Sequence, residues 1–345
     1  MSQAPIKVAI VGYGYSAKTF HLPYILQNPA FEWVAVSSRQ SEQLHEQWPD
    51  ITCYLDPYEM FEKSDADLVI ITAPNDVHYP LAKAALLQGK HVILEKPFVI
   101  QSSEGEKLIE IADTHHCILS VFQNRRWDGD FMTLRDLITS GKLGDIKYFE
   151  SHFDRYRPTV RERWRELDTN GGGILFDLGP HLLDQAVCLF GMPEAITAQC
   201  RIMRPKGTTV DYVNMTLDYD GCVVNLHANL YSPEPNLRYK VLGTKAKYIK
   251  YGLDDQERNL KAGLIPLSES WNQSLHEQSG TVYQEEAEPD EVVTQSGSYH
   301  RYFEHIAHAL RTGEGNPVPA EEALQSIRLI EAALESHQSG RRIML

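Results

Sequence analysis

Near its start the chain reads IKVAIVGYGYSA (residues 6–17), and this stretch decides the fold of the first part of the protein. Ile6 to Val11 form an apolar run of strand length, and the GxGxxA pattern from Gly12 to Ala17 follows it directly. Gly12 suits a tight turn, Gly14 lets the backbone approach a pyrophosphate, and a small residue at position 17 lets a helix pack on the strand. The pattern predicts a dinucleotide-binding turn at a helix N-terminus, although by itself it also fits an ordinary turn.

Four further apolar runs follow in the first third of the chain. They are Phe31–Ser37, Asp67–Ala73, His91–Glu95 and Cys117–Phe122, and amphipathic stretches such as Tyr79–Leu87 and Ser103–His115 lie between them. Strands that alternate with helices and are apolar throughout are typical of a parallel sheet covered on both faces. Residues 1–122 are therefore predicted to form an α/β, doubly wound Rossmann domain that binds a dinucleotide.

Beyond Gln123 the pattern changes to strands of alternating polarity. A helix near Phe131–Thr139 precedes the predicted strands Ile146–Phe153, Ala195–Arg201, Val213–Tyr219, Val223–Tyr231 and Tyr239–Gly243. The acidic stretch Val282–Gly297 is predicted to be a solvated loop, and Ala320–Ser336 a closing helix. We expect residues 123–345 to form an α+β domain with an open, mostly antiparallel sheet, which binds substrate and oligomerises.

Composition limits the class of protein. The 345 residues exceed the roughly 250–300 at which a single core stops growing, which favours two domains. Residues up to Phe122 carry 8 Lys and Arg against 15 Asp and Glu, and the rest carry 25 against 32, so each part has a net charge of −7 and nucleic acid is a poor partner. Five scattered cysteines without a CxxC pair, no signal peptide and no apolar run of about 18 residues predict a cytoplasmic protein without a membrane partner.

The end of the second predicted strand indicates which dinucleotide is bound. The dinucleotide fingerprint calls for an acidic residue there to hold the ribose, but the chain reads VAVSSR (residues 34–39). Without a carboxylate nothing repels a 2′-phosphate, while Ser38 can donate a hydrogen bond and Arg39 a charge-assisted one. The sequence therefore favours NADP over NAD; the alternative is that Arg39 is an ordinary surface arginine.

Several later motifs, in this order and spacing, resemble the glucose-fructose oxidoreductase and inositol dehydrogenase (Gfo/Idh/MocA) family. They are TAPN (72–75) with His78, EKP (95–97), QNRRW (123–127) and GGGILFDLGPHLLD (171–184). The resemblance covers essentially the whole chain and, with RYRP (155–158) among the motifs, is greatest to the branch of NADP-dependent scyllo-inositol dehydrogenases. It implies that the cofactor is held by Gly12, Tyr13, Gly14, Ser38, Arg39, Ala73, Pro74, Asn75, His78, Glu95 and Lys96; for Asn75 a turn-forming role is the alternative.

The resemblance also implies a catalytic set of Lys96, Asp177 and His181. Lys96 follows an apolar strand and so lies at the carboxyl edge of the sheet, where ligands of such folds bind. Asp177, His181 and Asp184 would share one face of a helix, and a histidine beside a carboxylate can accept the proton of an alcohol. A capping Asp with a buried His is the structural alternative, and we expect Asp184 to be structural. No metal is expected, because no third ligand accompanies the pair.

A sugar-like substrate needs groups that bind hydroxyls. Asp154, Tyr156 and Tyr231 are predicted for this role with Lys96, Asp177 and His181, and Arg155 is a further candidate. The alternative is that Asp154, Arg155, Tyr156 and Tyr231 are ordinary sheet residues. The Gly171–Gly173 run is interpreted as an entry segment that lets backbone pass close to the substrate.

Together these features predict an NADP-dependent oxidoreductase that transfers a hydride between nicotinamide and a secondary hydroxyl of a cyclic polyol or sugar, inositol-like, in carbohydrate metabolism. The alternatives are an NADPH-dependent reductase of a keto-sugar or other cyclic ketone and a non-catalytic, dinucleotide-binding sugar sensor. Retention of the catalytic set favours an enzyme. The uncovered face of the second sheet, with the family resemblance, predicts a homodimer or homotetramer.

Overall fold

The computed structural model describes residues 4–167, 170–272 and 279–345, which form two compact units. The first unit comprises Met1–Asn124, Gln256–Trp271 and Tyr299–Leu324, and the second comprises Arg125–Asp255, Asn272–Ser298 and Gln325–Leu345. Two later segments thus return to the first unit, whereas the predicted domains 1–122 and 123–345 are contiguous. That these two stretches are separate domains stays a prediction.

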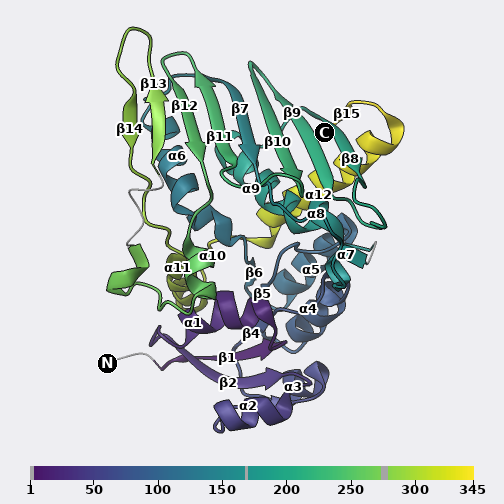
Figure 1. The fold of residues 1–345 in the computed structure, drawn as a ribbon. Helices are drawn as coiled ribbons and strands as arrows, with labels where there is room; N and C mark the ends of the chain where they lie inside the picture. Colours follow the sequence, from purple (N-terminus) through teal and green to yellow (C-terminus); the bar gives the residue numbers. More distant parts are fainter. Residues whose placement is uncertain (1–3, 168–169, 273–278) are drawn as a thin grey trace. The chain divides into compact units, whose positions relative to one another are not determined.

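The first unit is built on a parallel sheet, which in the described residues has six strands (Figure 1). They are β1 (Ile6–Val11), β2 (Phe31–Ser37), β3 (Thr52–Tyr54), β4 (Leu68–Ile71), β5 (His91–Leu94) and β6 (Leu119–Val121). Their order is β3-β2-β1-β4-β5-β6, and every neighbouring pair is parallel. The predicted doubly wound sheet is confirmed, and its carboxyl edge collects the residues that follow β1, β2, β4 and β5.

Helices connect these strands. The first unit contains η1 (Ala17–His21), α1 (Leu22–Ile25), α2 (Ser41–Gln47), α3 (Pro57–Lys63), η2 (Asn75–Val77), α4 (His78–Leu87), α5 (Ser102–Thr114), α10 (Gln256–Lys261) and α11 (His300–Thr312). The N-terminus of α3 shows why a helix begins there: the Asp56 carboxylate accepts a hydrogen bond from Tyr58 N, and Pro57 occupies the first turn. Three elements cross from one unit to the other: η3 (Asn124–Trp127), η4 (Glu269–Asn272) and α12 (Ala320–Ser339).

The second unit is built on a mixed sheet with nine strands among its described residues (Figure 1). In spatial order they are β14 (Asp290–Val292), β13 (Gly280–Tyr283), β12 (Lys247–Tyr251), β11 (Leu237–Gly243), β7 (Ile146–His152), β10 (Cys222–Asn229), β9 (Tyr212–Tyr219), β8 (Ala195–Arg201) and β15 (Ile343–Met344). Only the β7–β10 pair is parallel among these described neighbours, so the predicted mostly antiparallel sheet is confirmed.

The prediction that the acidic stretch Val282–Gly297 is a loop was partly wrong. Val282 lies in β13, and Asp290–Val292 form β14, which pairs with β13 in an antiparallel hairpin. Charged residues on an edge strand face water and leave no apolar period in the sequence, which explains why the pattern did not indicate a strand.

The two faces of the second sheet differ. Strands β9 and β10 alternate buried with half-buried side chains, and α8 (Gly173–Asp177) and α9 (Gly179–Phe190) pack against them. The unit also contains α6 (Gly129–Thr139) and α7 (Trp164–Leu167). Side chains on the opposite face, such as Tyr148, Glu150 and Asn225, are only half-buried, and we call this side the open face. In the described part of the chain no helix is both long and apolar enough to cross a bilayer.

Candidate active site

The glycine-rich turn is tight at Gly12 and open at Gly14. Gly12 has φ of +90°, and a side chain there would also meet Thr72 Oγ1 at 2.9 Å, so only glycine fits without strain. Thr72 Oγ1 donates to the Val11 carbonyl oxygen at 2.9 Å and fixes the end of β1 against the end of β4. Around Gly14, by contrast, an added Cβ would meet nothing within 4 Å, so the backbone can be approached from outside.

The side chain of Tyr13 ties the glycine-rich turn to neighbouring residues of the first unit. Its hydroxyl donates to Gln47 Oε1 at 3.1 Å and accepts from Trp48 Nε1 at 2.9 Å, and its ring stacks on Trp33. Lys18 Nζ lies 4.1 Å from the centre of the same ring. With the phenol thus engaged, the part of Tyr13 that suits a bound cofactor is its backbone.

The end of β2 presents the two polar groups predicted to select the cofactor. Ser38 Oγ accepts from Gln40 N at 3.1 Å, which leaves the hydroxyl proton available for donation. Arg39 is exposed, and its guanidinium makes no hydrogen bond or ion pair with any described residue. That these two groups bind a phosphate stays a prediction.

Glu95 connects the glycine-rich turn to the end of β5. Its Oε1 accepts a hydrogen bond from Ser16 Oγ and lies 2.9 Å from His21 Nε2, while Oε2 accepts from Lys96 N at 3.1 Å. Burial raises the pKa of Glu95, but the hydrogen bonds from His21 and Ser16 outweigh it and lower the pKa to about 2. The carboxylate therefore stays charged and positions the backbone of Lys96, which is itself half-buried.

His78 links the loops that follow β4 and β5. Its Nδ1 lies 2.9 Å from the Pro97 carbonyl oxygen and its Nε2 3.0 Å from that of Ala73, and the Lys96–Pro97 peptide bond is cis. Burial lowers the pKa of His78 despite these carbonyls. Because the imidazole has no exposed surface, it holds the two loops in place, and its direct contact with a cofactor stays a prediction.

Beside His78, Pro74 is exposed and Asn75 is buried at the start of η2. Both follow β4 and so lie at the same carboxyl edge as Gly12 and Lys96. The first unit thus brings the predicted cofactor residues to one edge of its sheet.

In the second unit, Asp177 and His181 lie on consecutive helices. Asp177 ends α8 and is half-buried, whereas His181 lies in the first turn of α9 and is 5% exposed. The prediction that Asp177 and His181 share one helix was wrong, because α8 ends at Asp177 and α9 begins with Gly179 and Pro180.

Arg155 and Phe153 adjoin these two residues. Arg155 NH1 lies 3.5 Å from Asp177 Oδ2, and the Phe153 ring is stacked on His181 with 6.2 Å between centroids. Arg155 Cζ lies 5.2 Å from the centre of the Phe153 ring, so one aromatic side chain contacts both neighbours. Arg155 therefore holds the Asp177 carboxylate electrostatically.

Asp184 is structural, as expected. Arg126 Nε donates to Asp184 Oδ2 at 2.8 Å, and Arg126 Nη2 donates to Asp184 Oδ1 at 2.7 Å. This bidentate ion pair is almost entirely buried. It anchors α9 one turn beyond His181.

Asp154 is not brought together with Asp177 and His181. Successive residues of extended backbone point to opposite sides, so Asp154 faces away from the side on which Phe153 meets His181. Its carboxylate lies 3.0 Å from His152 Nδ1 and 3.0 Å from His227 Nδ1 on the open face. Its predicted contact with substrate stays untested, as does that of Tyr156 and Tyr231, which pair in a backbone bridge and have exposed side chains.

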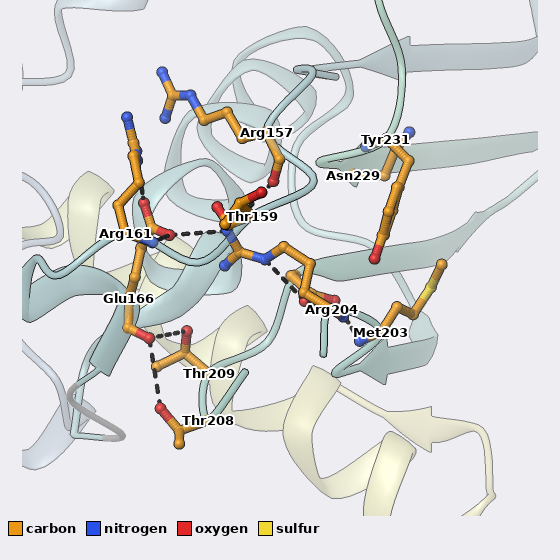
Figure 2. Close-up of polar contacts among 11 residues, drawn as sticks. Arg157, Thr159, Arg161, Glu166, Met203, Arg204, Thr208, Thr209, Asn229 and Tyr231 are labelled. Carbon is orange, nitrogen blue, oxygen red and sulfur yellow. Dashed lines mark hydrogen bonds and ion pairs between the residues drawn. The ribbon is translucent and has the colours of Figure 1, made fainter. Parts of the chain in front are cut away.

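A buried ion-pair network fixes the segment after Arg155 (Figure 2). Arg204 Nε donates to Asp211 Oδ2 at 3.1 Å and NH1 donates to Glu166 Oε2 at 2.8 Å, while Arg161 Nε donates to Glu166 Oε1 at 2.6 Å. Arg157 belongs to the same segment, and its carbonyl oxygen accepts a hydrogen bond from Arg204 Nη1 at 3.4 Å (Figure 2). Burial, with the charges of Arg155 and Arg161, lowers the pKa of Arg157 to about 10.

The Gly171–Gly173 run has a packing role. At Gly173, with φ of +77°, a Cβ would lie 2.8 Å from the Val210 carbonyl oxygen, which also accepts a hydrogen bond from Ile174 N. The run therefore lets the start of α8 contact the chain before β9, and its approach to a substrate stays a prediction.

Comparison with known proteins adds to this geometry. Residues 6–123 match the model of the oxidoreductase family's NAD-binding Rossmann fold (GFO_IDH_MocA), and residues 135–345 match that of the family's C-terminal alpha/beta domain. The uncharacterized oxidoreductase YdgJ of Escherichia coli is 43% identical over 332 residues, covering 96% of each chain. The scyllo-inositol 2-dehydrogenase (NADP(+)) IolW of Bacillus subtilis is 39% identical over 343 residues, covering 99% of this chain and 96% of that one.

Solved structures agree with these relationships. A Yersinia pestis structure, YPO2259, described as that of an oxidoreductase, superimposes with a TM-score of 0.93 at 43% identity and covers 100% of this chain and 99% of its own. The yvaA structure from Bacillus subtilis also has a TM-score of 0.93, at 37% identity and 99% coverage of both chains.

Proposed function

The chain belongs to the Gfo/Idh/MocA family and is an NAD(P)-dependent oxidoreductase, and from this we propose that it uses NADP to oxidise a secondary hydroxyl of a cyclic polyol or sugar, or to reduce the matching ketone. The proposal is supported by the relative IolW, a scyllo-inositol 2-dehydrogenase (NADP(+)), and by the polar residues at the end of β2. Inositols are the first substrates to consider.

The residues of the first unit fit a dinucleotide. The positive φ at Gly12 and the open space at Gly14 leave backbone N–H groups accessible to a pyrophosphate, and Ser38 and Arg39 suit a 2′-phosphate. When bound, NADP supplies the hydride chemistry, so the protein has to position it and to move a proton.

Three side chains would do the remaining work. His181 accepts the hydroxyl proton during oxidation, and its stacking on Phe153 fixes the plane of the imidazole. Asp177, held beside Arg155, orients the substrate hydroxyl, and Lys96 donates a hydrogen bond to the reacting oxygen.

The observation that carries the proposal is the presence of Lys96, Asp177 and His181 together, because a sugar sensor that had given up catalysis would have no need to retain them. A keto-sugar or cyclic-ketone reductase would use the same groups in the opposite direction. The choice between oxidation and reduction therefore depends on the substrates.

A substrate panel tests the proposal. Initial rates of NADP reduction would be measured with inositols, aldoses and uronates, and rates of NADPH oxidation with the corresponding ketones. We expect at least one polyol or sugar to reach kcat/KM on the order of 10⁴ M⁻¹ s⁻¹ with NADP. NADPH binding without turnover in either direction would instead identify a sensor.

We also propose that the chain assembles as a homodimer or homotetramer through its open face and works in the cytoplasm. The half-buried aromatic and polar side chains of that face suit a protein contact, and five cysteines without a CxxC pair suit a reducing compartment.

A further inference from the structure

Two histidines and a carboxylate converge on the open face, at the ends of β7 and β10. His152 Nδ1 lies 3.0 Å from Asp154 Oδ2, and His227 Nδ1 lies 3.0 Å from Asp154 Oδ1. The three ligand atoms all lie within 4.8 Å of one another. No metal was expected from the sequence, because no third ligand accompanies Asp177 and His181. Here the parallel pairing of β7 with β10 brings His227 beside His152, which is 75 residues earlier in the chain.

The spacing of these atoms suits a small divalent cation. Metal–ligand distances of about 2.1 Å in a tetrahedral site place neighbouring ligand atoms roughly 3.4 Å apart. Each Nδ1 lies 3.0 Å from a different oxygen of Asp154, and the one ligand atom that each residue offers lies within 4.8 Å of the other two. Rotation of the imidazoles, which retain some exposed surface, and of the carboxylate would bring the three atoms to this spacing. The exposure of the imidazoles also leaves room for water as a fourth ligand.

The surrounding groups orient the ligands as they do in metal sites. His152 Nε2, the nitrogen that faces away from Asp154, lies 2.8 Å from Glu150 Oε1. A carboxylate on the second nitrogen of a ligating histidine is the usual arrangement, because it fixes the ring and raises the basicity of the ligand. Asn229 N donates to Asp154 Oδ1 at 3.1 Å, and Tyr212 packs edge-on against the His227 ring.

Charge also favours a cation. The carboxylates of Glu150 and Asp154 both face this cluster, and Lys240 Nζ lies 3.8 Å from Glu150 Oε2, which balances one of the two charges. A cation that replaced the Nδ1 protons shared with Asp154 would neutralise the charge of the Asp154 carboxylate. Two imidazoles with one carboxylate favour Zn²⁺ and its transition-metal neighbours over Mg²⁺ or Ca²⁺.

We propose that His152, Asp154 and His227 form a binding site for a divalent transition-metal ion, with Zn²⁺ the first choice. The ion would tie the end of β7 to β10 on the side of the backbone opposite to the Phe153 ring that contacts His181. Its role is therefore structural, in the second sheet, and separate from proton transfer.

The test uses tag-free, full-length protein dialysed against a chelator and then freed of it. Titration with Zn²⁺ by calorimetry should give one site per chain with Kd of about 10 μM or tighter, and Co²⁺ should produce the visible absorption of a nitrogen-liganded site. His227→Gln and Asp154→Asn should each weaken binding at least 30-fold. Circular dichroism would confirm that both variants are folded.

The matched control is the double variant His115→Gln with His116→Gln, which removes two exposed histidines of the first unit and should leave Zn²⁺ affinity unchanged. Three results would overturn the proposal: no saturable binding of Zn²⁺ below about 100 μM, equal affinity in the parent and both site variants, or loss of binding in the control alone. Because no step uses activity, the outcome is independent of the proposed reaction.

Discussion

Replacing Glu95 by Gln should destabilise the first unit markedly, because this buried carboxylate holds the glycine-rich turn and the end of β5 together. Its pKa falls from an ordinary 4.5 to about 2, a change of about 2.5 units, which corresponds to about 3 kcal/mol of stability at pH 7. Glutamine keeps a hydrogen-bond acceptor for Ser16 but loses the charge that faces His21. We expect the melting temperature to drop by about 5–10 °C.

The pH dependence gives the sharper test. A carboxyl whose pKa is lowered by folding contributes fully above its unfolded value near 4.5 and loses that contribution as the pH falls toward 2. The difference in unfolding free energy between parent and Glu95→Gln, from urea titration followed by circular dichroism, should therefore shrink to less than half between pH 7 and pH 3. Glu59→Gln, at an exposed pair with Lys63, is the control and should change little. A Glu95→Gln effect no larger than the control, or one independent of pH, would refute the reasoning.

Three further predictions concern the cofactor, the second unit and the assembly. Arg39→Ala should raise KM for NADP about tenfold or more and leave KM for NAD nearly unchanged; equal losses in steady-state assays would contradict the assignment. Asp184→Asn removes the charge that faces the buried Arg126 guanidinium and should cost about 3–5 kcal/mol in urea unfolding, so a cost below 1 kcal/mol would exclude the anchoring role. Light scattering at micromolar concentration should give at least twice the 39.2 kDa chain mass, and a 39.2 kDa particle would disprove assembly.

Much of the fold follows from local pattern. The five apolar runs of the first third all became strands of one parallel sheet, with β1 and β2 at the predicted bounds. The sheet's edge strand β3 was missed because three residues carry no measurable period. Strand β14 was missed because its exposed charges are typical of loops. The formation of a short edge strand depends on the strand that it pairs with, and a single sequence does not show which strands pair.

The parts of the site whose geometry is fixed by a local motif could be predicted from the sequence. The parts whose geometry depends on the pairing of distant strands could not. Gly12 has the positive φ and Gly14 the open surroundings that their spacing indicates, and their contact with a cofactor stays a prediction. Asp154 and Arg155 were both predicted to bind substrate hydroxyls. Extended backbone turns their side chains to opposite sides, and the role of Asp154 stays a prediction. No local sequence pattern indicates that His152 and His227 lie side by side.

The role of His181 is the central claim about the reaction, and one comparison tests it most directly. With a substrate that the parent enzyme turns over well, kcat/KM of His181→Ala should fall by about 10² or more, while the Kd for NADP, measured by fluorescence titration, stays close to that of the parent. The acidic limb of the pH profile for oxidation should disappear in the same variant. Activity of His181→Ala within threefold of the parent would contradict the account and leave Lys96 or a bound water as the proton carrier.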